Sequence, residues 1–258
     1  MSSLKIEIKN LTKYFYLKEF PKGLKVIDNL TLSVNEGEFI SIIGPTGCGK
    51  TTLLNIISGV EEPTSGHVLV NGKPAKEQIG IIGYMLQREV FLPWRNVIGN
   101  ILIGSEIRGD SPKKKLELAR SYLEEYKLLG FEKEYPHHLS GGMRERIALI
   151  RTLINDPEVI LFDEPFSDVD YETRLYLECD IADIIEKRGK TAIFVTHDIE
   201  EAISMGEKVV VLAKSPARIK AVFDVSFSIT DRNPLSVRGT QEFAAIFSRI
   251  WSKFKEPI

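Results

Sequence analysis

A loop between an apolar run and a helical pattern has the glycine, lysine and threonine spacing of a phosphate-binding site. The run is Phe39–Ile43, and the loop after it reads Gly-Pro-Thr-Gly-Cys-Gly-Lys-Thr-Thr, which fits GxxxxGK[ST]. Its glycines allow backbone angles that turn successive amide groups toward an anion. Lys50 is expected to reach the outer phosphates of a nucleoside triphosphate, and Thr51 to bind Mg²⁺. The residues expected to bind nucleotide are Gly44, Pro45, Thr46, Gly47, Cys48, Gly49, Lys50, Thr51 and Thr52.

Two adjacent carboxylates follow a second apolar run. Val159–Phe162 predicts a buried strand, and Asp163 and Glu164 come directly after it. Burying a carboxylate at the end of a strand costs free energy unless a cation lies beside it. The Mg²⁺ expected at Thr51 can be that cation. Asp163 is therefore predicted to hold Mg²⁺, and Glu164 to orient or deprotonate a water molecule. The alternative is a strand-end turn with two surface acids.

A histidine and a glycine pair mark two further candidate positions. His197 follows the predicted strand Thr191–Thr196, and the carboxyl ends of parallel strands line the ligand crevice of such sheets. From the residues alone, a capping or core role for His197 is equally good. Ser140, Gly141 and Gly142 open a predicted helix and can bind an anion through backbone amides, or simply cap the helix. The spacing does not show whether these residues would contact a nucleotide bound to the same chain or to another chain.

The order of elements predicts an α/β fold with a largely parallel core sheet. Apolar strands alternate with helices after residue 155, which indicates βαβ units, and the first ~85 residues are strand-rich. Residues from about 88 to 155 are expected to form a helical insertion. We expect one domain over 4–230 and a short C-terminal helical cap over 231–258, with an apolar stripe at Phe243, Phe247, Ile250 and Phe254 packed on this domain.

Three local predictions concern pairing and capping. Alternation at Leu4–Ile8 indicates an edge strand. His67–Val70 and Ile79–Met85 are expected to be strands around a turn at Asn71-Gly72. Asp198, with Glu201 three residues later, is expected to form a capping box.

Composition limits the class of protein. The chain has 258 residues, and its net charge of −2 argues against nucleic-acid binding as its main function. Its two cysteines form no disulfide framework, which favours a reducing compartment. No apolar run approaches the ~20 residues that a membrane span needs. We expect a soluble cytoplasmic chain.

The order of the motifs resembles the ATPase subunits of ABC transporters. Leu139–Met143 reads LSGGM before the strand that ends in Asp163, Gln87 precedes the helical insertion, and His197 follows the next strand. The likeness covers about Ile6 to Ile219. It implies ATP and Mg²⁺ as cofactors, and a homodimer, or a pair with a similar subunit, that sandwiches two ATP molecules head to tail.

The same resemblance implies roles for individual residues. Ser140, Gly141 and Gly142 would contact the γ-phosphate held by the other subunit. Gln87 would contact Mg²⁺ and sense the membrane partner, and Ser167 to Asp170 would be the D-loop, with Asp170 as its acid. Phe15 falls at the position that stacks on adenine, although Tyr14 or Tyr16 can serve. Glu164 and His197 would carry the hydrolysis, together with Gln87.

A finer likeness concerns transport. Phe91–Val97 and Tyr135-Pro136-His137 are similar to importer ATPases for nitrate, taurine, alkanesulfonate and bicarbonate. The likeness implies that a transmembrane permease contacts Gln87 to Trp94 and that a solute-binding protein acts through this permease. It also implies that the transported solute is a small anion or sulfonate-like, and that the chain is bound peripherally to the inner face of the membrane. The alternative for the apolar cluster is core packing. The alternative function is a non-transport ABC ATPase with a nucleic-acid or ribosomal partner.

Cys48 departs from the usual phosphate loop, which has serine there. Because it lies at a helix N-terminus, its thiol pKa is expected to be depressed, so that alkylation blocks ATP binding and Mg-ATP protects.

Overall fold

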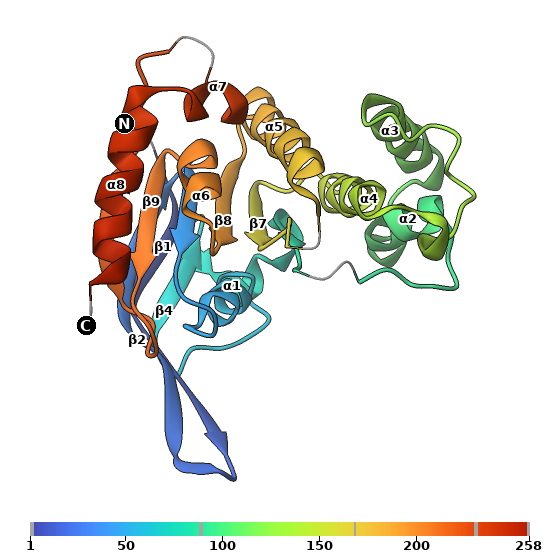
Figure 1. The fold of residues 1–258 in the computed structure, drawn as a ribbon. Helices are drawn as coiled ribbons and strands as arrows, with labels where there is room; N and C mark the ends of the chain where they lie inside the picture. Colours follow the sequence, from blue (N-terminus) through green and yellow to red (C-terminus); the bar gives the residue numbers. More distant parts are fainter. Residues whose placement is uncertain (1–2, 88–89, 168, 230–231, 257–258) are drawn as a thin grey trace.

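Two β-sheets and a group of helices make up the fold (Figure 1). The computed structural model describes residues 3–87, 90–167, 169–229 and 232–256. The predicted fold class is confirmed: a mixed, largely parallel sheet lies beside an antiparallel sheet, with the phosphate loop between strand and helix. Among the described residues, no helix combines the length and apolar character needed to cross a bilayer.

The antiparallel sheet has the order β2-β1-β4-β5. Its strands are β1 (Leu4–Leu17), β2 (Phe20–Asn35), β4 (Ser65–Val70) and β5 (Lys73–Pro74). Ile6 pairs with Val34 on one side and with Val70 on the other, so β1 is a central strand and the prediction of an edge strand is wrong. The ends of β1 and β2 form a long ribbon that extends beyond the body of the molecule (Figure 1).

The six-stranded sheet has the order β10-β9-β3-β8-β7-β6 and is parallel except for β10. Its strands are β3 (Phe39–Ile43), β6 (Ile82–Met85), β7 (Val159–Asp163), β8 (Thr191–Thr196), β9 (Lys208–Leu212) and β10 (Ile219–Asp224). All residues of β3, β7 and β8 are buried, as expected for parallel strands covered on both faces. β3 lies between β8 and β9, so the strand before the phosphate loop is central.

The predicted hairpin around Asn71-Gly72 is only half right. The turn joins β4 to the short strand β5, through pairs such as Val70 with Lys73. The later part of the predicted segment becomes β6, which pairs in parallel with β7 in the other sheet. The 3-10 turns η1 (Ala75–Glu77) and η2 (Ile79–Ile81) carry the chain between the two sheets.

Two helices cover the sheets close to the phosphate loop. α1 (Lys50–Ile57) places Leu53 and Leu54 in one core with residues of both sheets. α6 (Ile199–Met205) packs in another core with β9 and with α8 (Gln241–Lys255). Phe243 and Ile250 of α8 are buried there, so its apolar stripe packs on this chain as predicted. α7 (Pro234–Arg238) links α6 to α5 (Tyr171–Arg188).

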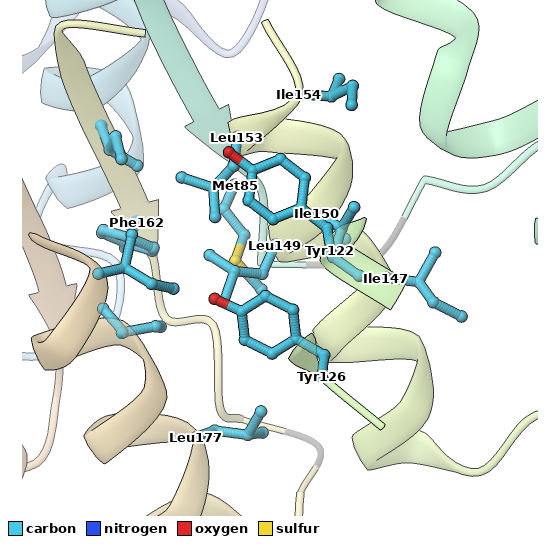
Figure 2. Close-up of a cluster of buried hydrophobic side chains, with 14 of the residues drawn as sticks. Met85, Tyr122, Tyr126, Ile147, Leu149, Ile150, Leu153, Ile154, Phe162 and Leu177 are labelled. Carbon is cyan, nitrogen blue, oxygen red and sulfur yellow. The ribbon is translucent and has the colours of Figure 1, made fainter. Parts of the chain in front are cut away.

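Three helices form the part of the molecule at the right of Figure 1. They are α2 (Val97–Arg108), α3 (Pro112–Glu125) and α4 (Gly141–Leu153), with the 3-10 turn η3 (Pro136–His138) before α4. Figure 2 shows their core, where Tyr122, Tyr126 and Ile150 meet Met85, Phe162 and Leu177 of the sheet and α5. α3 ends at Glu125, and two residues later Lys127 adopts a left-handed backbone with φ 58°, which does not continue a helix.

Candidate functional site

The phosphate loop lies between the end of β3 and the start of α1. Gly49 precedes α1 with φ 113°, a backbone conformation that favours glycine, and a side chain there would also lie 3.1 Å from the carbonyl oxygen of Val26. At Gly44, a Cβ would lie 2.7 Å from Cys48 Sγ. Gly49 is therefore required by backbone angle and by space, and Gly44 by space.

Lys50 is buried at the base of the loop, with 5% of its surface exposed. Its Nζ donates to the carbonyl oxygen of Gly44 at 2.9 Å and lies 3.2 Å from Glu164 Oε1. The charge of this lysine is thus balanced by the carboxylate that follows β7.

Glu164 connects the loop to the end of β8. Its Oε2 lies 2.8 Å from His197 Nδ1, and its backbone N–H donates to Val195 O. Its φ of 45° lies in the left-handed region, which costs about 1 kcal/mol for a residue other than glycine. Because β7 and β8 are neighbours, Glu164 and His197 lie together at the carboxyl ends of these strands. We call Lys50, Asp163, Glu164 and His197 the carboxylate cluster.

Asp163 is the buried acid of this cluster, with 2% of its surface exposed. Burial raises the pKa of its carboxyl group, and hydrogen bonds from Thr51 and Tyr84 oppose that effect. Tyr84 donates to Oδ2 at 3.4 Å, whereas Oδ1 has no hydrogen-bond partner within the described part of the chain. A buried carboxylate oxygen without a partner, beside a threonine hydroxyl, fits a site for a hard divalent cation.

The start of α4 borders a separate hollow of about 540 Å³. Ser140 caps the helix by accepting from the N–H of Met143 at 3.3 Å, and a Cβ at Gly142 would lie 2.5 Å from Thr173 Cγ2. The lining of this α4 hollow consists of Ser140, Gly141, Gly142, Met143, Arg146, Val169, Asp170, Thr173 and Tyr176. No residue from 44 to 52 contributes to that lining, so the two candidate anion sites are separate within one chain.

Comparison with known proteins identifies the family. A family model described as ABC transporter matches residues 27–167. The aliphatic sulfonates import ATP-binding protein SsuB of Bacillus anthracis is 34% identical over 254 residues, covering 97% of this chain and 96% of the relative. An uncharacterized ABC transporter ATP-binding protein of Methanocaldococcus jannaschii is 43% identical over 223 residues, 86% of this chain and 82% of the relative. The chain belongs to the ABC transporter family.

A solved structure of the family is similar over most of the chain. It is the dimeric, post-hydrolysis state of the ATP-binding cassette MJ0796 bound to ADP and Pi, with a TM-score of 0.77 and 29% identity, covering 86% of this chain and 99% of the other. The chain is an ABC-type ATP hydrolase, and the likeness to importer ATPases drawn from its motifs is confirmed by the relatives named SsuB.

The segment predicted to be the D-loop follows Glu164 and precedes α5. Ser167 is exposed, and its N–H donates to the carbonyl oxygen of Glu164 at 3.3 Å. Asp170 accepts from the N–H of Thr173 at 3.0 Å, and this backbone hydrogen bond is the main reason that the pKa of Asp170 is lowered. Asp170 therefore caps α5 and borders the α4 hollow. Asp168 lies outside the described residues.

Gln87 and Phe15 lie at two other edges of the ATPase. Gln87 is exposed, two residues beyond the end of β6, while Arg88 and Glu89 lie outside the described residues. Phe15 is half-buried in β1, with Lys13 Nζ 4.8 Å from its ring centre. Tyr14 and Tyr16 alternate with Phe15 along the strand, and their rings stack on each other at 6.5 Å. The adenine contact at Phe15 stays a prediction.

The expectation that the thiol pKa of Cys48 is depressed is wrong. Its side chain is fully buried, and burial raises the pKa of its thiol, although Lys50 and backbone hydrogen bonds oppose the rise. The thiol points beneath the loop, against Gly44. At this position, the loss of hydration on burial outweighs the stabilisation of the thiolate by Lys50 and by the backbone N–H groups.

The capping box at α6 is also wrong. Asp198 does cap the helix, accepting from the N–H of Glu200 at 2.8 Å, but the N–H of Asp198 donates to Thr196 Oγ1. Glu201 instead accepts from Thr196 Oγ1 at 2.5 Å and from Arg174 at 3.0 Å. Because its carboxylate binds these two donors, Glu201 does not reach back to the N–H of Asp198.

Sequence reasoning missed two contacts near the site. Arg174 joins the first turn of α5 to the start of α6, through Glu201 and, at 3.5 Å, Asp198. Ser215 donates to the carbonyl oxygen of Gly47 at 3.1 Å and so supports the phosphate loop from the segment after β9. Arg174 follows Asp170 by four residues, a spacing that could have signalled contact near the D-loop; nothing in the sequence marks Ser215.

Proposed function

We propose that this ABC ATPase powers the uptake of a small anion or sulfonate-like solute, as one of two ATPase subunits bound to a transmembrane permease. The ion pair of Glu164 with Lys50 and its hydrogen bond with His197, beside the unpartnered Asp163 Oδ1, carry the ATPase part of this proposal. The importer part rests on the relatives named as sulfonate import ATP-binding proteins.

In this proposal, hydrolysis begins with an exchange of ion pairs. Lys50 leaves Glu164 for the outer phosphates of ATP, because a phosphate group offers more negative charge than one carboxylate. Glu164 is then free to take a proton from the attacking water. His197 Nδ1 holds the other carboxylate oxygen and orients Glu164. Backbone amides from Gly44 to Thr52 hold the phosphates.

Mg²⁺ would be held by Thr51, Asp163 and Gln87. The unpartnered Oδ1 of Asp163 fits this assignment, and so does the burial that raises the pKa of its carboxyl group. When bound, the ion supplies positive charge that balances the phosphates.

Two copies would complete each ATP site between them. Ser140, Gly141 and Gly142 border the α4 hollow, which contains no residue of the chain's own phosphate loop. A second copy placed head to tail would bring its bound ATP into this hollow, where the exposed Ser140 can contact a phosphate. The dimeric cassette MJ0796 supports pairing of this kind. Asp170 borders the same hollow and would contact the partner.

The permease would contact the apolar segment after Gln87. Trp94 is 72% exposed and Val90 is 57% exposed, whereas Phe91 is half-buried beneath the guanidinium of Arg151. The exposure of Trp94 favours a binding surface over core packing for this side chain. A chain bound to a permease in this way would lie on the inner face of the membrane, and a solute-binding protein would act through the permease.

The test is affinity purification of the tagged chain from its own membranes in mild detergent, with mass spectrometry of the bound proteins. We expect a stoichiometric multi-span protein that stimulates the ATPase after reconstitution in lipid. A ribosomal or nucleic-acid partner without a permease would overturn the proposal and support the non-transport alternative.

Two variants locate the contact. Trp94→Ala should lose the permease while retaining ATP binding, because the side chain is exposed and far from the phosphate loop in sequence. Ile107→Ala is the matched control, since Ile107 is 81% exposed at the other end of α2. Equal retention of the permease by both variants would place the contact elsewhere.

A further inference from the structure

Asn100 lies under the loop that carries Trp94. It is in the first turn of α2 and only 1% exposed. Its Nδ2 donates to the carbonyl oxygens of Leu92 at 3.2 Å, Arg95 at 2.9 Å and Asn96 at 3.0 Å. Its Oδ1 accepts from the N–H of Leu92 at 2.8 Å. One side-chain amide thus holds both ends of the loop 92–96.

The chemistry of these contacts requires an amide. The Asn100 NH₂ group has two hydrogens to share among these carbonyl oxygens, and its Oδ1 accepts from a backbone N–H, so the contacts need a donor and an acceptor in one side chain of this length, which asparagine offers. An aspartate would turn a carboxylate toward three carbonyl oxygens. An alanine would remove the side-chain partner of the Leu92 N–H and of the Arg95 carbonyl oxygen, whereas the carbonyl oxygens of Leu92 and Asn96 would keep their backbone donors. Pro93 and Trp94, at the outside of the loop, remain exposed.

The same helix start is bonded to the segment that leads to Ser140. The N–H of Val97 donates to Glu134 O at 2.8 Å, and the N–H of Ile98 donates to Glu132 O at 3.1 Å. The first amides of a helix have no partner within the helix, so these bonds satisfy groups that are otherwise free. Two different segments, 92–96 and 132–134, are therefore fixed to one helical turn.

From Glu134 the chain runs directly to the α4 hollow. The short turn η3 follows, with the N–H of His138 donating to Tyr135 O at 2.9 Å. Leu139 is buried, and Arg144 of α4 donates to its carbonyl oxygen at 3.0 Å. Ser140 comes next. The hydrogen bonds leave little freedom between the first turn of α2 and this serine.

We infer that Asn100 is the positioning residue that couples the permease contact at Trp94 to the placement of Ser140. When the permease displaces Trp94, loop 92–96 moves with it. The hydrogen bonds of Asn100 transmit this displacement to the first turn of α2, and the bonds from that turn transmit it to residues 132–140. This inference rests on the proposed function, because it needs a partner bound at Trp94. Asn100 touches neither nucleotide nor permease in this scheme.

The test compares the ATPase of the isolated chain with that of the chain reconstituted in lipid with its co-purified permease. For Asn100→Ala and Asn100→Asp, we expect the kcat and KM of the isolated chain to stay within twofold of the wild type. We expect stimulation by the permease to fall at least tenfold, through kcat rather than KM. Permease binding should persist, because Trp94 is still present.

Asn155→Ala is the matched control. Asn155 accepts from Ser105 Oγ at 2.9 Å, near the far end of α2, so its loss disturbs the same helix away from the loop. This variant should keep its stimulation. A structural readout comes from Trp94 fluorescence in a Trp251→Phe background, which leaves Trp94 as the single tryptophan of the sequence. Asn100→Ala should lower its anisotropy.

The outcomes separate the two proposals. If the wild type recruits no permease, the proposed function fails before any variant is compared. If the wild type is stimulated and both Asn100 variants are stimulated equally, the coupling inference is overturned. It is also overturned if the variants lose basal and stimulated activity in the same proportion, since that pattern indicates general damage to the fold.

Discussion

At the carboxyl ends of β7 and β8, Lys50, Glu164 and His197 are bound to one another, whereas the α4 hollow presents Ser140 and two glycines around an open space. In the carboxylate cluster, the charged side chains contact one another through Glu164. The α4 hollow presents Ser140 and two glycines, and its charged lining residues are Arg146 and Asp170, one of each sign. A nucleotide must therefore break an ion pair to enter the cluster, while it can meet the α4 hollow without displacing anything.

The difference between the carboxylate cluster and the α4 hollow predicts that ATP binding and ATP turnover depend on different regions of the chain. Affinity for ATP should reside in the loop and Lys50, because charge-assisted bonds to phosphate are the strong ones. The α4 hollow should act only after a second copy brings its ATP there. Substitutions in the two regions are expected to differ in kind as well as in size.

The largest expected effect is at Glu164. Glu164→Gln should lower ATP turnover at least about 100-fold, because the proton acceptor is lost. It should also tighten ATP binding several-fold, because Lys50 no longer has a competing carboxylate. Steady-state hydrolysis and the Kd for a fluorescent ATP analogue measure both. Glu172→Gln, at an exposed site nearby, is the control, and weaker ATP binding by Glu164→Gln would contradict the exchange of ion pairs.

A mixing experiment tests whether the two regions act in different chains. Lys50→Ala should abolish ATP binding, and Ser140→Arg should leave binding by dilute single chains unchanged while turnover falls at least about tenfold. In a head-to-tail pair of the two variants, one of the two sites has an intact loop and an intact Ser140. Mixing them should restore measurable hydrolysis. No recovery at any ratio would argue against sites shared between chains.

A smaller effect concerns the stability of the carboxylate cluster. Burial raises the pKa of Asp163 above its ordinary value of 3.8, so the folded chain holds this proton more tightly than the unfolded chain. The stability of the bare chain should therefore fall as pH rises through the interval between the two values. Asp163→Asn should raise the free energy of unfolding at pH 7 by about 1 kcal/mol, a Tm increase of roughly 2–4 °C, and abolish hydrolysis.

Thermal unfolding across pH measures this effect. Asp183→Asn is the control, because Asp183 is an exposed carboxylate paired with Lys187. A Tm that falls for Asp163→Asn would mean that Tyr84 and Thr51 already compensate the buried charge. The cluster would then be satisfied without a cation.

The smallest effect is expected at Cys48. Because the thiol is buried with a raised pKa, iodoacetamide at pH 8 should modify it at least about tenfold more slowly in the folded chain than in urea. A Cys179→Ala background isolates the signal, and peptide mass spectrometry measures it. Fast modification of the folded chain that Mg-ATP prevents would mean that the loop opens in solution.

Sequence reasoning reached the features that depend on neighbours along the chain. The phosphate loop, the apolar strand before Asp163 and the caps at Ser140 and Asp198 are all set by residues within a few positions. Parallel strands buried on both faces leave continuous apolar runs, which is why β3, β7 and β8 were predictable.

The features that were missed depend on pairing between distant segments. β6 joins the core sheet because it pairs with β7, more than seventy residues later, and its own residues do not specify a sheet. Glu201 has capping spacing, but Arg174 and Thr196 draw its carboxylate away. α2 was missed because apolar residues occupy most of its circumference, so no helical stripe stands out.

The central position of β3 also constrains when the protein can first become active. β3 ends at Ile43, but its neighbours are β8 and β9, whose residues lie about 150 positions later. During synthesis, the phosphate loop therefore leaves the ribosome long before the strands that support it. Contacts so distant in sequence form late in folding. A nascent or truncated chain should thus be unable to consume ATP until almost the whole cassette has been made.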